Sequence, residues 1–278
     1  MSLSGTLVST DAGRVFVHRS GPAATNTPPL VVLHGLLLSH YYFEPIAEAL
    51  AAQRPLVMID LLGFGESDRP PVAQFDYRPE RHVDTLVKVL DQLGVGAFDL
   101  LGHSMGGALS IELAARLPER ARRVATIAAA LFPLPLNTQR KLLLSPGLGD
   151  VLWHNAITRR EMGRVFREEQ VVRPSDISDR LIDFYWARFN RPGAKDAALA
   201  SARAIAFRQD PTPILKRVQQ SVLVLHGEAD QLVPIANGRR LVETLAQAEL
   251  KLIPAAGHHP VLERTRLVLR HLEGFFSA

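Results

Sequence analysis

The chain has no cysteine among its 278 residues. This absence excludes disulfide bonds, thiolate metal sites and a cysteine nucleophile. Long apolar runs are also missing, because the longest, "VATIAAALFPLPL" (124–136), is too short to span a bilayer and contains two prolines. The first residues, "MSLSGTLVSTDAG", have neither the basic start nor the apolar core of a secretory signal. We therefore expect a soluble cytoplasmic protein with no membrane span.

Charge of one sign is scarce as well, since the formal net charge is only +4 and the arginines are scattered among acids. The densest basic cluster, "ERARR" (119–123), is expected at a helix end on a solvated face, so no nucleic-acid partner is expected. Nothing has the spacing of metal ligands or of a phosphate-cradling glycine loop, so we expect no metal and no organic cofactor. An apolar content of 47% over this length predicts one main core.

Short, nearly continuous apolar runs alternate with helical patterns. Runs without polar alternation are typical of strands buried on both faces of a parallel sheet. They occur at 29–34, 54–60, 98–102, 123–129, 221–227 and 250–254. Helical patterns occur at 42–52, 78–93, 104–117, 236–247 and 262–276. This alternation predicts an open α/β sheet with right-handed crossovers.

The alternation breaks between about residues 132 and 213, where helical stretches follow one another without a strand. Both tryptophans and many of the other aromatic side chains fall in this span. An aromatic-rich helical insertion is typical of a lid over a sheet, although most such aromatics serve simply as the packing core of the small helical subdomain. We therefore expect a core domain of residues 1–131 and 214–278, with a helical cap at 132–213.

A serine lies between glycines where an expected strand meets an expected helix, in "LLGHSMGGALS". Gly102 and Gly106 lack a Cβ, so they permit a tight turn that lifts the Ser104 hydroxyl clear of the sheet. In open parallel sheets, active sites lie beyond the carboxyl ends of the strands, where we expect Ser104. The sequence therefore predicts a nucleophile at Ser104, and the alternative is that the residue only caps the helix.

A serine hydroxyl needs a base, and the ten histidines offer several. His258, in "PAAGHHP", follows the last expected strand on a glycine-loosened loop and is the preferred base, with His259 as the fallback. His34 and His226 each end a strand before a glycine, which favours a role in bracing loops. His103 neighbours the serine and is expected to point along the turn.

The base in turn needs an orienting carboxylate. Asp230 follows "VLVLHGE" at the end of another strand and lies in a turn closed by a proline, while Glu228 is the competing acid. The order Ser104, Asp230, His258 is the one expected for a hydrolase triad on this kind of sheet.

Acyl transfer also needs donors for the negative oxygen of the tetrahedral intermediate. The backbone N–H of Met105, at the start of the helix after the serine, is one candidate. The loop "HGLLLS" after the first buried strand offers the other, most plausibly the backbone N–H of Leu36.

With these elements in place, the chain resembles the α/β-hydrolase superfamily over nearly its whole length. The matching motifs are "HGLLLS" (34–39), "DLLGFGESDRP" (60–70), "GHSMGG" (102–107), "HGEADQLVP" (226–234) and "GHHP" (257–260). The resemblance implies a mostly parallel eight-stranded sheet with helices on both faces and a helical cap inserted after strand 6. Within "DLLGFGESDRP", Asp60, Ser67 and Asp68 are expected to shape the loop.

The superfamily runs many reactions on one scaffold, so the fold alone does not give the substrate. A serine at position 104 argues against the haloalkane dehalogenase and epoxide hydrolase branches, which use an aspartate there. We expect a serine esterase acting on a small to medium, mostly apolar and weakly charged ester, as a monomer or homodimer. The alternatives are a carbon–carbon bond hydrolase of ring-cleavage products, a lactonase or a perhydrolase, and, from another class, a non-catalytic ligand receptor. Ring-cleavage hydrolases usually carry a glycine-rich oxyanion loop, from which "HGLLLS" departs.

Overall fold

One sheet forms the centre of the protein in the computed structural model, which describes residues 5–22 and 27–277. Its eight strands lie in the order β1-β2-β4-β3-β5-β6-β7-β8. The strands are β1 (Thr6–Thr10), β2 (Gly13–Ser20), β3 (Leu30–Leu33), β4 (Leu56–Ile59), β5 (Phe98–His103), β6 (Ala121–Ile127), β7 (Ser221–Gly227) and β8 (Ala248–Ile253). The expected eight-stranded α/β sheet is therefore confirmed.

Strands β3 to β8 pair in parallel, and the antiparallel hairpin β1–β2 joins the sheet beside β4. Every residue of β3, β4 and β5 is buried, which agrees with their continuous apolar runs. The apolar runs did not predict β1 and β2, because buried and exposed positions alternate in these two strands. The basic cluster 119–123 is exposed in part but ends no helix, since it forms a turn and the start of β6.

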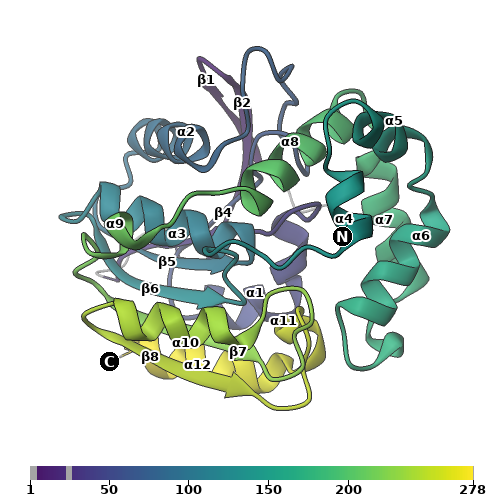
Figure 1. Ribbon diagram of the computed structural model, residues 1–278. Helices are drawn as coiled ribbons and strands as arrows, with labels where there is room; N and C mark the ends of the chain where they lie inside the picture. The colour runs from purple at the N-terminus through teal and green to yellow at the C-terminus, as the bar shows by residue number, and fades with distance from the viewer. Residues whose placement is uncertain (1–4, 23–26, 278) are drawn as a thin grey trace.

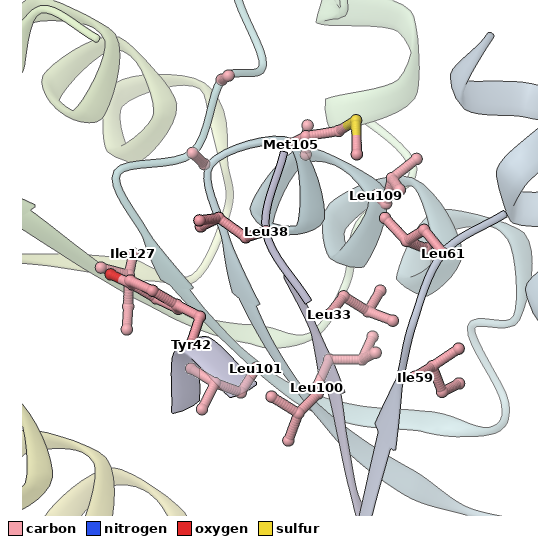
Figure 2. Close-up of a cluster of buried hydrophobic side chains, with 14 of the residues drawn as sticks. Leu33, Leu38, Tyr42, Ile59, Leu61, Leu100, Leu101, Met105, Leu109 and Ile127 are labelled. Atoms are coloured by element: carbon pink, nitrogen blue, oxygen red, sulfur yellow. The ribbon is translucent and has the colours of Figure 1, made fainter. Parts of the chain in front are cut away.

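Helices cover both faces of the sheet (Figure 1). One face carries α2 (Pro79–Gln92), α3 (Met105–Arg116) and α10 (Ile235–Thr244), and the other carries α1 (Glu44–Ala51) and α12 (Thr265–Ser277). A short helix, α11 (Pro260–Glu263), precedes α12, so the single helix expected at 262–276 is interrupted at its start. Figure 2 shows Leu33, Ile59 and Leu100 of three neighbouring strands beneath Met105 and Leu109 of α3. This packing fixes α3, and with it the turn that carries Ser104, on the sheet.

Between β6 and β7 the chain forms a run of helices and turns with no strand among them. It comprises α4 (Thr138–Leu143), α5 (Leu148–Asn155), α6 (Arg159–Arg164), the π-helical turn η2 (Val165–Glu169), the 3₁₀ turn η3 (Pro174–Asp176), α7 (Asp179–Phe189), α8 (Ala194–Ala206) and α9 (Thr212–Leu215). Helices α4 to α7 lie to one side of the sheet (Figure 1), whereas α9 contacts α3 of the core. Residues 132–213 remain our proposed cap.

Within residues 5–22 and 27–277, no helix has both the length and the apolar character needed to cross a bilayer.

Candidate active site

The turn between β5 and α3 holds Ser104 in a strained backbone conformation, with φ 53° and ψ −114°. A non-glycine residue at positive φ is uncommon and persists only where its surroundings enforce it. Here a Cβ on Gly106 would come within 2.2 Å of the Leu33 carbonyl oxygen, and one on Gly102 within 2.2 Å of the Gly106 carbonyl oxygen. The two glycines thus let α3 approach β3 and β5, and the strain falls on the serine between them.

Asp230 and His258 meet beyond the ends of β7 and β8. Nδ1 of His258 lies 2.8 Å from Oδ2 of Asp230, and both side chains are almost completely buried. The other carboxylate oxygen, Oδ1, accepts the backbone N–H groups of Leu232 and Val233 at 2.9 Å each. The carboxylate is therefore fixed by its own turn and presents one free edge to the imidazole.

Two opposing effects act on the pKa of Asp230. Burial acts to raise it, but the adjacent His258 and the backbone donor Val233 outweigh burial, so the pKa lies below its ordinary value. His226 braces the same turn, because its Nε2 donates to the Val233 carbonyl oxygen at 2.9 Å. Asp230 is thus held as an anion beside the imidazole.

The backbone of His258 is held from two sides, by two residues whose role was not predicted from the sequence. Nε2 of His103, the last residue of β5, donates to the His258 carbonyl oxygen at 2.8 Å. The His258 backbone N–H donates to the Gln170 carbonyl oxygen, in the segment after η2, at 2.7 Å. Burial, reinforced by His258 nearby, lowers the pKa of His103 well below its ordinary value, which keeps it a neutral donor. The position of His103 beside Ser104 was the available signal, whereas Gln170 is reached only through the packing of the cap.

The two fallback residues, His259 and Glu228, take no part in the hydrogen bond between His258 and Asp230, although His259 also lines the cavity that contains Ser104. Nε2 of His259 lies 2.7 Å from the side-chain oxygen Oε1 of Gln170, and the ring stacks on Phe166 with centroids 5.6 Å apart. Burial lowers the pKa of His259 well below its ordinary value. Glu228 is exposed and points to no partner among the described side chains. The geometry therefore favours His258 and Asp230 over these alternatives.

The loop after β3 lies beside the serine. His34 braces this loop as expected, since its Nδ1 donates to the Gly35 carbonyl oxygen at 2.7 Å and its Nε2 accepts the Leu61 N–H at 3.0 Å. A Cβ on Gly35 would come within 3.1 Å of the Ser104 Cβ, so the loop passes close to the turn that carries Ser104. Among the hydrogen bonds of residues 5–22 and 27–277, none uses the backbone N–H of Leu36 or Met105. Both amides stay available as the proposed oxyanion donors.

A cavity of about 300 Å³ opens onto Ser104 and His258. Its walls come from the loop after β3, from the turn after β7 and, for the larger part, from the cap. The apolar lining includes Leu36, Leu38, Leu134, Leu143, Trp153, Ile157, Met162, Phe166, Phe189, Ile205 and Val233. The serine thus faces a mainly hydrophobic chamber, as a site for a small organic substrate requires.

Four charged side chains of the cap also line this cavity, and they pair with one another. Arg140 lies 2.8 Å from Glu169, and Arg164 lies 3.0 Å from the same carboxylate. Arg164 also pairs with Glu161 through two of its nitrogens. Two guanidinium groups and two carboxylates therefore neutralise each other on the cavity wall.

The "DLLGFGESDRP" loop has the structural role expected for it. Asp60 is wholly buried and accepts the backbone N–H groups of His40 and Glu66. Ser67 donates to the Asp60 carbonyl oxygen, and Asp68 pairs with Arg14 of β2 at 3.0 Å. These contacts join the loop to the sheet rather than to the cavity.

The sequence and the fold both match known proteins. The family model described as "alpha/beta hydrolase fold" matches residues 28–265. A 2-hydroxymuconate semialdehyde hydrolase of Pseudomonas sp. (strain CF600) is 29% identical over 261 residues, covering 90% of this chain and 86% of its own. The structure of a meta-cleavage product hydrolase from Pseudomonas fluorescens IP01 superposes with a TM-score of 0.83 at 22% identity, covering 98% and 97% of the two chains. That of a thermophilic esterase from Thermogutta terrifontis superposes with a TM-score of 0.78 at 21% identity, covering 99% and 98%. The chain therefore belongs to the α/β-hydrolase family.

Proposed function

We propose that the protein is a serine hydrolase that cleaves a small to medium, mostly apolar carboxylic ester through an acyl-enzyme. The observation that carries the proposal is the hydrogen bond between Asp230 and His258 beside a cavity that also exposes Ser104. A buried carboxylate, an imidazole and a strained serine on one chamber are the parts that acyl transfer needs.

In this mechanism, Oγ of Ser104 attacks the ester carbonyl carbon while Nε2 of His258 takes its proton. The N–H groups of Leu36 and Met105 donate to the oxygen that becomes negative. The tetrahedral intermediate collapses as His258 returns the proton to the leaving alcohol. His258 then activates water, which releases the acid and regenerates the serine. Asp230 keeps the proton of the resting imidazole on Nδ1 and stabilises its charged form.

The lining of the cavity supports an apolar substrate of low charge. Most of the wall is aliphatic or aromatic, and its charged groups are already paired. A carboxylate on the substrate would have to compete with Glu169 for Arg140 or Arg164. We therefore expect a neutral ester to bind better than a dicarboxylate of the same size.

A carbon–carbon bond hydrolase of ring-cleavage products is the second candidate, because the relatives include enzymes named 2-hydroxymuconate semialdehyde hydrolase. The same three side chains would then act on a vinylogous diketone. The oxyanion loop "HGLLLS" departs from the glycine-rich loop usual in such enzymes.

The deciding experiment measures release of p-nitrophenol from acetate, butyrate and octanoate esters, with the Ser104→Ala variant as the control. Loss of the yellow colour of a ring-cleavage product is followed in parallel. Serine-dependent ester turnover with a chain-length optimum supports the first candidate. Turnover of the ring-cleavage product alone supports the second, and binding without any turnover by the folded protein supports a receptor.

A further inference from the structure

Glu263 is a buried carboxylate that the proposed mechanism does not use. It ends α11 and is only 5% exposed. Burial raises its pKa, and the backbone N–H groups of Val172 and Gly257 act in the opposite direction. No arginine, lysine or histidine side chain pairs with it within residues 5–22 and 27–277. Burying a carboxylate costs free energy unless hydrogen bonds compensate for the lost water, so the groups that bind Glu263 must offset that cost.

The two oxygens of Glu263 bind two different parts of the chain. Oε1 accepts the backbone N–H of Val172 at 2.7 Å, in the cap segment that follows η2. Oε2 accepts the backbone N–H of Gly257 at 2.8 Å, in the loop that carries His258. The side chain therefore bridges the cap segment 170–172 and the histidine loop 256–258.

Other contacts join the same two segments. The His258 N–H donates to the Gln170 carbonyl oxygen at 2.7 Å. A Cβ on Gly257 would come within 2.6 Å of that oxygen, so only glycine allows the two backbones to lie this close. Val171, between the two bonded residues, is buried. The backbone of the base is thus seated directly against the cap.

Of the side chains with the length of glutamate, only the carboxylate can accept both backbone N–H groups. A glutamine has a single acceptor oxygen, and its NH₂ group would face the second N–H donor. One of the two backbone N–H groups would then be buried and unpaired, which is expensive. The chemistry of the two donors therefore explains a glutamate at position 263.

We propose that Glu263 is a positioning residue that couples the cap to the catalytic base, so that His258 is correctly placed only while segment 170–172 is seated. This role rests on the proposed function, because it concerns the placement of the base in that mechanism. As a result of this coupling, segment 170–172 packs in place and His258 is oriented at the same time.

The test compares the Glu263→Gln and Asp99→Asn variants with the unmodified protein. Asp99 is an equally buried carboxylate, but it lies at the start of β5, at the opposite end of that strand from Ser104, and pairs with Arg54. Hydrogen exchange of peptides covering 168–173 and 255–260 reports the seating of each segment without any substrate. Steady-state kinetics on p-nitrophenyl butyrate and the rate of Ser104 labelling by a fluorophosphonate report the base.

In Glu263→Gln, amide exchange in the two segments should rise together by about tenfold or more, as expected when one buried hydrogen bond is lost. Both kcat and the labelling rate should fall by about ten- to a hundredfold, with a smaller change in KM. Asp99→Asn should lose stability but keep its kcat within about twofold, as expected for a change remote from the site.

Faster exchange in only one of the two segments would overturn the coupling. So would a kcat of Glu263→Gln that matches that of Asp99→Asn. If the unmodified protein hydrolyses no ester, the proposed function fails, but hydrogen exchange still decides whether Glu263 couples the two segments.

Discussion

Replacing Asp230 by asparagine is the sharpest test of the proposed site, because the structure dictates how the amide must lie. Oδ1 of Asp230 accepts two backbone N–H groups at 2.9 Å, so the asparagine oxygen will occupy that position. The NH₂ group then takes the place of Oδ2 and faces Nδ1 of His258, 2.8 Å away. Nδ1 has to accept this hydrogen bond, which moves the imidazole proton to Nε2.

With its proton on Nε2, His258 has no lone pair to accept the proton of Ser104. The same exchange of aspartate for asparagine lowers kcat by about 10⁴ in an unrelated serine protease, through the wrong tautomer. That factor corresponds to about 5 kcal/mol of lost transition-state stabilisation. Both turn hydrogen bonds to Oδ1 survive, so the melting temperature should change by no more than about 5 °C.

The assay is kcat on the best p-nitrophenyl ester, measured beside thermal unfolding. Glu228→Gln is the matched control, because this exposed carboxylate lies two residues earlier in the same turn. We expect it to keep the activity of the unmodified protein. A folded Asp230→Asn variant that retains more than about 1% of kcat, far above the expected factor, would refute the reasoning. A large loss in Glu228→Gln would move the role of the acid to that residue.

Four further changes have expected outcomes. Gly106→Ala should lower the free energy of unfolding in urea by about 3 kcal/mol or more, because the added Cβ would lie 2.2 Å from a β3 carbonyl oxygen. Gly96→Ala is the control, because a Cβ there meets open space, and it should lower the free energy of unfolding by less than about 1 kcal/mol. Equal losses in the two variants would contradict this reasoning. His103→Phe removes the donor to the carbonyl oxygen of His258, the proposed base, and should lower kcat about tenfold; an unchanged kcat would show that His103 does not position His258. Burial acts to raise the pKa of Asp60, but the effects of His40 and His34 together outweigh burial, so the pKa lies below its ordinary value. Asp60 therefore contributes its full stabilisation above about pH 5 and loses it as the pH falls through the pKa of the folded state. Asp60→Asn should therefore show a shallower loss of unfolding free energy from about pH 5 to pH 3, and an unchanged slope would exclude Asp60 as its source. Glu169→Gln frees positive charge on the cavity wall and should raise kcat/KM for carboxylate-bearing esters relative to neutral ones, and no change in that ratio would refute the pairing argument.

The central sheet was predictable because its strands are buried on both faces, and burial on both faces is written into the sequence as unbroken apolar runs. The stretches Leu30–Leu33 and Leu56–Ile59 are entirely apolar and entirely buried. The hairpin formed by Thr6–Thr10 and Gly13–Ser20 was not predicted from such runs, since its strands have exposed positions between buried ones. Its existence followed only from the resemblance, which implied eight strands.

In the candidate site, too, some residues were predictable from the local sequence and others were not. Ser104 directly follows β5, and Asp230 and His258 lie in the loops that begin where β7 and β8 end. The sheet therefore brings the three residues to one edge, and local sequence was enough to propose them. Gln170 and Glu263 act through backbone contacts between the cap and the histidine loop. No spacing rule predicts which cap residue packs on which loop, because this depends on how the helices of the insertion fold over the sheet.

The charges of the cap bear directly on the choice between ester and carbon–carbon bond cleavage. One relative is named a 2-hydroxy-6-oxo-2,4-heptadienoate hydrolase, and a dienoate carries a carboxylate. Such a substrate needs a cation or several donors in the cavity. The two arginines on this cavity wall already hold Glu161 and Glu169, so a dienoate that binds to either guanidinium group would have to compete with a carboxylate of the wall. A neutral ester meets no such competition, and for this reason we propose the ester as the first candidate, although relatives are named for the other reaction.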